Sequence, residues 1–202
     1  SKSRYGHAKM TQLTRELGAF VAQLKYEHIP QAALDVIHMG FADCVGVMLA
    51  GRDEPPTKIL TEVLNPVAGP ANLMFTHQTA QAPEAAWING VAAHALDFDD
   101  VAIKGHPSTV LVPAIIAEAQ TLGSSGRDMM VAYAAGYEVW ADLARRELRG
   151  LSVQARYGGG AGQRGAGGNE VTAGRAARRV HRFGLLLCVT GAARTSGAGQ
   201  HR

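Results

Sequence analysis

The sequence predicts an all-α domain over residues 10–148, followed by a Gly/Arg-rich tail over residues 149–202 that we expect to be disordered or read out of frame. Apolar residues in the first part recur every three or four positions, the period of an amphipathic helix. Alternation with the period of a strand never persists for more than a few residues. From residue 151 onward the apolar period is lost and 12 of the 24 glycines occur, so too little apolar surface is available to offset the entropy of ordering.

Three helices are predicted in the first third of the chain. The first covers residues 11–25, where leucine, phenylalanine and valine recur at helical spacing. The second begins after Pro30 and runs to Gly51, which we expect to act as its C-terminal cap. The third begins at Pro55 and ends before the Asn65-Pro66 pair, because a residue that precedes proline disfavours the helical conformation. On the second helix, His38 lies among apolar neighbours and is predicted to be a core histidine.

The remaining helices follow a predicted loop over residues 67–79, which has at most a short extended segment at 73–75. One helix begins at Pro83 and leads into the central stretch described below. The next covers residues 110–122 and is closed by Gly123. The pair Ser125 and Asp128 resembles a capping box and is predicted to begin the last helix.

Ionisable residues gather between two of these helices. The 13 residues from His94 to His106 contain three carboxylates, two imidazoles and one ammonium, although only 18% of the chain is charged. Buried charges must be paired or neutralised, so such a concentration is poorly suited to a core. The stretch therefore predicts a polar pocket where one apolar helix ends and the next begins.

Charge and cysteine content narrow the class of protein. Residues 1–150 contain 12 Lys and Arg against 16 Asp and Glu, and residues 151–202 contain eight Arg against the single acid Glu170. The basic charge thus belongs to the tail, so we expect no nucleic-acid partner for the main body. No run approaches the ~18 apolar residues of a membrane span, so we expect no membrane partner either. Two cysteines are too few for a disulfide framework, and the polar N-terminus lacks the apolar core of a secretion signal, so a cytoplasmic location is expected.

Three interpretations of the central stretch remain open from its residues alone. Asp97, Asp99 and Asp100 could hold Mg²⁺ for diphosphate chemistry, although no second set of ligands is evident elsewhere. The stretch could also be a solvated helix end with an incidental histidine. We favour metal-free acid–base catalysis, in which a carboxylate orients the imidazole of His106. His94, one turn before Asp97, is predicted either to line the pocket or to pack in the core.

Several motifs resemble the MmgE/PrpD family, which includes 2-methylcitrate dehydratases, cis-aconitate decarboxylases and iminodisuccinate epimerases. The central motif is similar to the signature of that family over residues 89–114. Shorter motifs at residues 13–17, 43–51 and 135–138 are similar to the same family. Together these motifs cover residues 11–147.

The resemblance implies an all-helical first domain that packs with a later α+β domain, usually in a homodimer, with the active site between them. It also implies a lyase, dehydratase or epimerase that acts beside a carboxylate of a small di- or tricarboxylate, without metal or cofactor. By this resemblance, Asp97 is the pocket carboxylate and His106 the proton-transfer or substrate-binding imidazole. We further predict that Lys104, His94 and Asp100 bind the substrate, Lys104 because its charge would attract substrate carboxylates.

Two departures from the family pattern shape the functional expectation. Val101 stands where cis-aconitate decarboxylases carry a threonine, and the spacing from Asp97 to His106 is one residue shorter than theirs, which disfavours decarboxylase specificity. A Gly-Trp-His-x-Thr-like motif expected after the last helix is absent from the sequence that follows Arg149. We therefore expect a truncated chain, weakly active or inactive, that resembles 2-methylcitrate dehydratase. The alternative from another class is a non-catalytic helical interaction protein.

Overall fold

The structure, a computed structural model, describes residues 12–103 and 105–157, with side-chain surroundings through Arg146. These residues form six α-helices, one short 3-10 helix and one two-stranded antiparallel sheet, which confirms the predicted all-α class. The elements follow in this order: α1 (Gln12–Gln23), η1 (Tyr26–His28), α2 (Gln31–Gly51), α3 (Pro55–Leu64), β1 (Ala71–Asn72), β2 (Thr79–Ala80), α4 (Ala82–His94), α5 (Pro107–Leu122) and α6 (Gly126–Tyr157).

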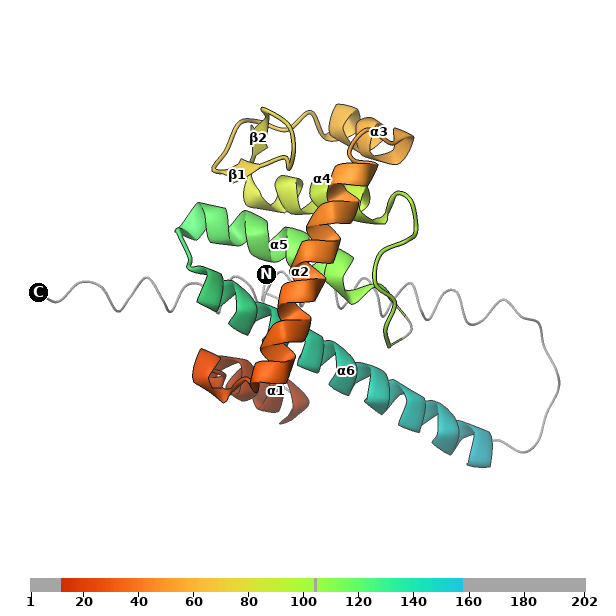
Figure 1. Cartoon of the computed structure of the whole chain (residues 1–202). Helices are drawn as coiled ribbons and strands as arrows, with labels where there is room; N and C mark the ends of the chain where they lie inside the picture. The colour runs from red at the N-terminus through yellow and green to blue at the C-terminus, as the bar shows by residue number, and fades with distance from the viewer. Residues whose placement is uncertain (1–11, 104, 158–202) are drawn as a thin grey trace, which may run out of the picture.

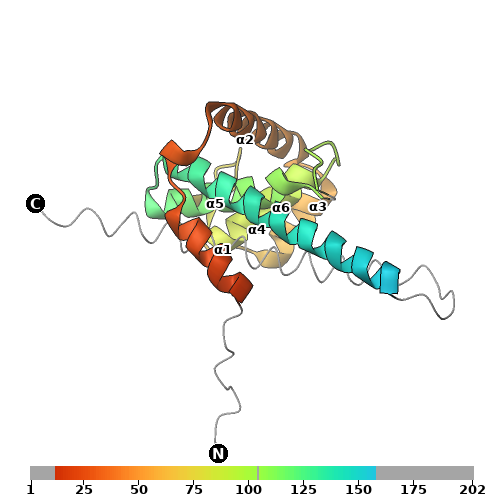
Figure 2. The same cartoon turned by 90° about the horizontal axis from the view of Figure 1, so that it is seen from below.

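The helices α4 and α5 lie side by side at the centre, and α2 crosses them on one face (Figure 1). The view from below shows α2 as a separate layer over α5 and α6 (Figure 2). Two clusters of buried side chains fill the space between these elements. The larger joins α2, α5 and α6 and includes Ile37, Cys44, Met48, Val112, Ile115 and Tyr133. The smaller joins the hairpin to α4 and α5 and includes Ala71, Leu73, Ala80, Ala85, Ile88 and Ala117.

Most helix ends lie close to the residues predicted for them. Asn65 ends α3 in the left-handed conformation with a φ of 42°, and Gly123 ends α5 with a φ of 66°. The capping box at α6 is confirmed, because the backbone N–H of Ser125 donates to Asp128 Oδ2 at 2.9 Å and that of Asp128 donates to Ser125 Oγ at 3.3 Å. The helix α5 begins at Pro107, three residues before the predicted Val110.

Gly51 has a different role from the predicted cap. It is the last residue of α2, while Arg52 holds the C-cap position in a right-handed conformation. A Cβ atom on Gly51 would overlap the carbonyl oxygen of Ala92. The glycine is therefore required for the close approach of α2 to α4. Its role is to leave space for the α4 backbone, and it does not cap α2 as predicted.

Other local expectations are corrected by the structure. The extended residues are Ala71–Asn72, paired with Thr79–Ala80, whereas 73–75 belong to the connection between the strands. His38 is exposed on α2 and is not part of the core. The helix α6 continues to Tyr157, beyond the predicted boundary at residue 148, because 151–156 still contain several good helix formers. The rest of the predicted tail, residues 158–202, lies outside the described residues.

Among the described residues, α2 is the one helix long and apolar enough to cross a bilayer. Length and composition alone support that possibility, and a core helix of a soluble protein meets the same two criteria. One face of α2 carries the fully buried Cys44 and Met48 and packs on α4, α5 and α6. Only 28% of the apolar stretch of α2 is buried, so the opposite face of the helix lies exposed.

Candidate functional site

Two histidines face each other across the connection between α4 and α5. His94 is the last residue of α4, and His106 is the N-cap residue of α5. Their ring centroids lie 4.5 Å apart with an interplanar angle of 58°. The helices thus place two imidazoles together that are 12 positions apart in the sequence, as the predicted polar pocket requires.

The carboxylate of Asp99 lies between the two imidazoles, and its side chain has no exposed surface. Its Oδ1 forms a hydrogen bond with His94 Nδ1 at 2.9 Å. Its Oδ2 lies 2.9 Å from His106 Nδ1, but the two atoms are not aligned for a hydrogen bond, and each is buried without a hydrogen-bond partner. We refer to His94, Asp97, Asp99 and His106 as the cluster. Asp99 is its central residue, because it contacts both imidazoles.

Sequence reasoning did not select Asp99 as a site residue. The sequence offers Asp99 as a possible Mg²⁺ ligand, whereas the predicted pocket roles belong to the neighbouring carboxylates of Asp97 and Asp100. The direction of each side chain depends on the backbone turn at Asp97, which has a φ of 55°. Aspartate tolerates this left-handed region better than most residues, but an Asp-rich motif does not indicate which aspartate adopts it.

The loop that carries the cluster is held at several points. The backbone N–H of Asp97 donates to the His94 carbonyl at 3.2 Å, and Ala102 and Gly105 exchange backbone hydrogen bonds at 2.9 and 3.0 Å. Gly105 packs directly on the indole of Trp140, because a Cβ atom there would lie 2.7 Å from Trp140 Cζ2. His106 is thus positioned by the start of α5 on one side and by α6 on the other.

The other predicted site residues lie in different surroundings from one another. Asp97 has a side chain that is 78% exposed, with Oδ1 3.9 Å from His106 Nε2. Asp100 accepts a hydrogen bond from the backbone N–H of Ser108 at 3.0 Å, and a carboxylate in this position stabilises the first turn of α5. Lys104 lies outside the described residues. The predicted catalytic and substrate-binding roles of all five residues are not tested by these contacts and stay predictions.

Behind the loop, a buried polar network surrounds the start of α5. Ser108 Oγ lies 2.8 Å from the hydroxyl of Tyr133, and Cys44 Sγ donates to the Ser108 carbonyl at 3.4 Å. Burial raises the pKa of the Cys44 thiol well above its ordinary value, and the nearby carboxylates of Asp100 and Asp99 act in the same direction. Cys44 is therefore a protonated, inert thiol at neutral pH.

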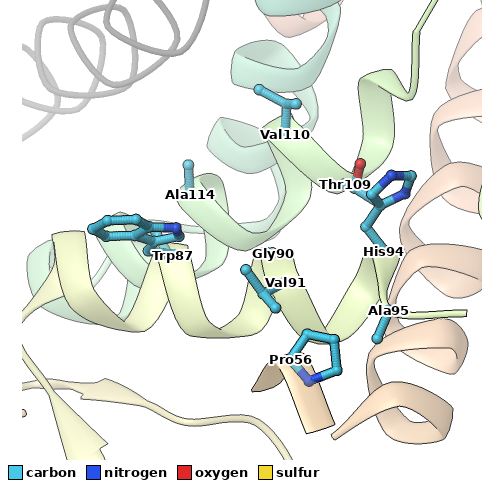
Figure 3. Close-up of a pocket in the computed structure, with 10 residues that line it drawn as sticks. Pro56, Trp87, Gly90, Val91, His94, Ala95, Thr109, Val110 and Ala114 are labelled. Atoms are coloured by element: carbon cyan, nitrogen blue, oxygen red, sulfur yellow. The ribbon is translucent and has the colours of Figure 1, made fainter. Parts of the chain in front are cut away.

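A cavity of about 400 Å³ opens beside His94, between α3, α4 and the start of α5. Figure 3 shows His94 and Thr109 at one end of it and Trp87 at the other. Its lining is apolar and small apart from these side chains and comprises Pro56, Ala86, Trp87, Gly90, Val91, His94, Ala95, Thr109, Val110 and Ala114. His94 is thus the titratable residue shared by the cavity and the cluster. A small ligand in the cavity would lie against its imidazole.

The cluster offers two kinds of chemistry. A carboxylate that holds an imidazole can orient it for proton transfer. The four residues also present one possible metal-ligand atom each, and these atoms all lie within 4.8 Å of one another. Imidazole nitrogen and carboxylate oxygen are common ligands of divalent transition metals.

Comparison with known proteins identifies relatives of the helical domain. The family model of the MmgE/PrpD N-terminal domain matches residues 15–154. Cis-aconitate decarboxylase of Mus musculus is 33% identical over 78 residues, which are 36% of this chain and 16% of that protein. Cis-aconitate decarboxylase of Homo sapiens is 42% identical over 60 residues, which are 27% of this chain and 12% of that protein. The matched segments therefore span only a small part of these relatives.

Proposed function

The chain belongs to the MmgE/PrpD family, and from that premise we propose that it supplies the helical part of an acid–base active site. The reaction class is that of a lyase or epimerase acting beside a carboxylate of a small di- or tricarboxylate, similar to 2-methylcitrate dehydratase. This chemistry uses proton transfer by side chains and requires no metal. A cytoplasmic location and assembly as a homodimer are part of the same proposal.

The observation that carries the proposal is the position of Asp99 between the two imidazoles, 2.9 Å from a ring nitrogen of each. The negative charge of a carboxylate 2.9 Å from His106 Nδ1 favours the tautomer with hydrogen on that nitrogen, and we propose that the ring rotates to complete this hydrogen bond when substrate binds. The opposite nitrogen of His106, Nε2, is then available as an acceptor. It lies on the side of the exposed Asp97.

In this mechanism His106 removes or delivers the proton at the carbon beside a substrate carboxylate. Asp99 is a positioning residue that acts through His106, while Asp97 lies close enough to the same imidazole to contact a bound substrate. His94, which opens onto the cavity, and Asp100 and Lys104 are proposed to contact the substrate. Proton transfer by a positioned group of this kind contributes roughly 10²- to 10⁴-fold to the rate.

The carboxylates near the cluster affect how it could bind an anionic substrate. Asp97, Asp99 and Asp100 place three carboxylates within four positions, and a polycarboxylate substrate would be repelled unless cations compensate for them. Removal of one donor that stabilises developing charge costs on the order of 3 kcal/mol in the transition state. We therefore propose that Lys104 is joined by further cations, supplied by residues outside the described part of the chain or by a second copy, and that this chain alone turns substrate over weakly.

The test measures turnover of cis-aconitate, 2-methylcitrate and an iminosuccinate by the purified full chain. We expect weak activity with one of them, reduced at least about 100-fold in His106→Gln. His77→Gln is the matched control, because His77 is exposed on the hairpin. Equal rates in the wild type and His106→Gln with every substrate would contradict the proposal.

A second candidate function is a non-catalytic interaction protein, favoured by the outer face of α2. Val36, Met39 and Leu49 on that face are 57%, 63% and 46% exposed, and exposed apolar side chains on one helix face are typical of interaction surfaces. Absence of turnover together with a stable complex that Met39→Glu disrupts would favour this function. The Mg²⁺-dependent diphosphate alternative predicts instead that a chelator abolishes activity and that Mg²⁺ restores it.

A further inference from the structure

We propose that His94, Asp97, Asp99 and His106 form a binding site for one divalent transition-metal ion of the Zn²⁺ class. The site is built from the end of α4, the following loop and the N-cap of α5. Nothing in the family match or in the relatives' names assigns a metal to these residues. The proposal rests on the donor atoms and their burial, and it does not depend on the proposed catalytic role.

The donor atoms of the four residues lie close together. One ligand atom from each of the four residues lies within 4.8 Å of the other three. In a tetrahedral zinc site, ligand atoms about 2.0–2.2 Å from the ion are roughly 3.4 Å from one another. Asp99 Oδ2 and His106 Nδ1, now 2.9 Å apart, would have to separate by only a few tenths of an ångström to admit the ion.

The second observation is the unsatisfied state of two buried atoms. Asp99 has no exposed side-chain surface, and its Oδ2 points at His106 Nδ1 without forming a hydrogen bond. Most buried polar atoms in folded proteins have a partner, and an exception requires an explanation such as an ion or an ordered water. A cation between the carboxylate and the imidazole satisfies both atoms at once.

The mixture of donors determines the class of ion. Mg²⁺ and Ca²⁺ prefer oxygen ligands, whereas two imidazoles with one or two carboxylates suit Zn²⁺ and its neighbours in the first transition row. Access is available from the exposed side, since the Asp97 side chain is 78% exposed and that of His94 is 49% exposed. The site is therefore expected to exchange its ion with solvent.

Metal binding and proton transfer exclude each other at His106. A bound ion takes up a ring lone pair, so the imidazole can no longer act freely as an acid or base. If the proposed acid–base function is correct, Zn²⁺ inhibits it, and a chelator relieves the inhibition. Failure of the catalytic proposal would leave the binding proposal unchanged, because binding is measured without a substrate.

The experiment is calorimetric titration of the purified, metal-free full chain with Zn²⁺, combined with thermal unfolding. We expect His94→Gln and Asp99→Asn each to bind one Zn²⁺ ion fewer than the wild type, or to bind it with a Kd at least about tenfold higher. Even substitutions in the outer shell of a metal site change metal affinity 10- to 100-fold. A ligand that binds only the folded state raises Tm, so Zn²⁺ should raise the Tm of the wild type more than that of either variant. Mg²⁺ at the same concentration should leave Tm unchanged.

Controls separate this site from other zinc-binding side chains. His38→Gln and His77→Gln remove exposed imidazoles on α2 and the hairpin and should leave affinity and stoichiometry unchanged. Because Asp99→Asn alters a buried residue, circular dichroism must first show that it is folded, and the half-exposed His94 provides the independent test. Two results would overturn the proposal. One is unchanged stoichiometry, affinity and Tm gain in folded His94→Gln, and the other is no Zn²⁺ uptake by the wild type at a Zn²⁺ concentration of about 1 mM, on the order of the weakest calcium sites.

Discussion

Two buried polar side chains near α4, Asn89 and Asp99, connect distant segments in different ways. Asn89 Oδ1 accepts from the backbone N–H of Met74 at 2.9 Å, and its Nδ2 donates to the carbonyl of Asn72 at 3.0 Å. Both ends of the amide are therefore satisfied, and the hairpin is fixed to the helix. Asp99 contacts two imidazoles at the same distance, yet only the contact with His94 has hydrogen-bond geometry.

The difference separates a structural contact from a candidate functional one. A fully paired amide contributes to stability, because loss of the side chain leaves two backbone groups unpaired. An incompletely paired buried carboxylate contributes little to stability and remains available for another partner, such as a proton or a cation. The structural role of Asn89 explains why a polar side chain is buried there. Packing alone does not explain why the carboxylate of Asp99 is buried.

The largest expected effect is the loss of catalytic activity in the Asp99→Asn variant. If Asp99 orients the imidazole of His106, kcat should fall roughly 10²-fold or more while KM changes much less, because the substrate contacts remain. Asn89→Ala should retain the kcat of the wild type per folded molecule. Steady-state kinetics on both variants checks this difference, and equal losses of kcat would show that Asp99 has only a structural role.

The next largest effect is the loss of stability in Asn89→Ala. The substitution leaves the N–H of Met74 and the carbonyl of Asn72 without their partner, at a cost of about 2–3 kcal/mol. For a domain of this size that corresponds to a decrease in Tm of roughly 5–12 °C. Urea unfolding followed by circular dichroism measures it, and a loss below about 0.5 kcal/mol would contradict the structural role.

A smaller effect is expected for the stability of Asp99→Asn. The variant loses one charge-assisted hydrogen bond to His94 but also relieves the desolvation of a buried charge, and these two terms oppose each other. We expect the free energy of unfolding to change by less than about 1 kcal/mol, well below the change in Asn89→Ala. A loss equal to that of Asn89→Ala would mean that Asp99 is a structural residue of the same kind.

The smallest expected effect concerns Glu118, a carboxyl group whose pKa is changed by burial alone. Burial raises the pKa of Glu118 on α5 above its ordinary value of 4.5, so the folded state holds this proton to a higher pH than the unfolded state. The stability contributed by Glu118 is therefore present below pH 4.5 and is lost as pH rises through the folded pKa. Glu118→Gln should match the wild type near pH 4 and have a slightly higher Tm than the wild type at pH 7. Thermal unfolding at both pH values checks this sign.

The helices of this domain could be predicted from sequence because their signals are local. Apolar periodicity, prolines at first turns and the glycine after α5 each act within a few residues of the feature they determine. The role of Gly51 could not be predicted, since it depends on the carbonyl of Ala92, which is 41 positions away in the sequence. For the same reason, the exposure of His38 could not be read from its apolar neighbours.

The sequence predicted that polar groups gather between α4 and α5, but it did not predict how they are arranged, and their predicted catalytic and binding roles stay predictions. The Asp- and His-rich stretch between helices indicated where these groups gather. The family resemblance is confirmed by the match over residues 15–154, whereas the chemistry that it implies stays a prediction. The arrangement within the loop depends on left-handed conformations at Asp97 and Ile103. An isoleucine rarely adopts this conformation, so no propensity predicts it. Lys104 and residues 158–202 lie outside the described residues, so the predictions made for them stay predictions.

The packing of Gly105 on Trp140 makes the site observable by spectroscopy. The chain has two tryptophans. Trp140 touches the residue next to His106, and Trp87 lies in the cavity that His94 borders. Indole emission depends on the polarity and motion of its surroundings, so a ligand that shifts the loop should alter the fluorescence of Trp140, and one that fills the cavity should alter that of Trp87. Replacing each tryptophan in turn by phenylalanine would convert the protein into a reporter of which side of the cluster is occupied.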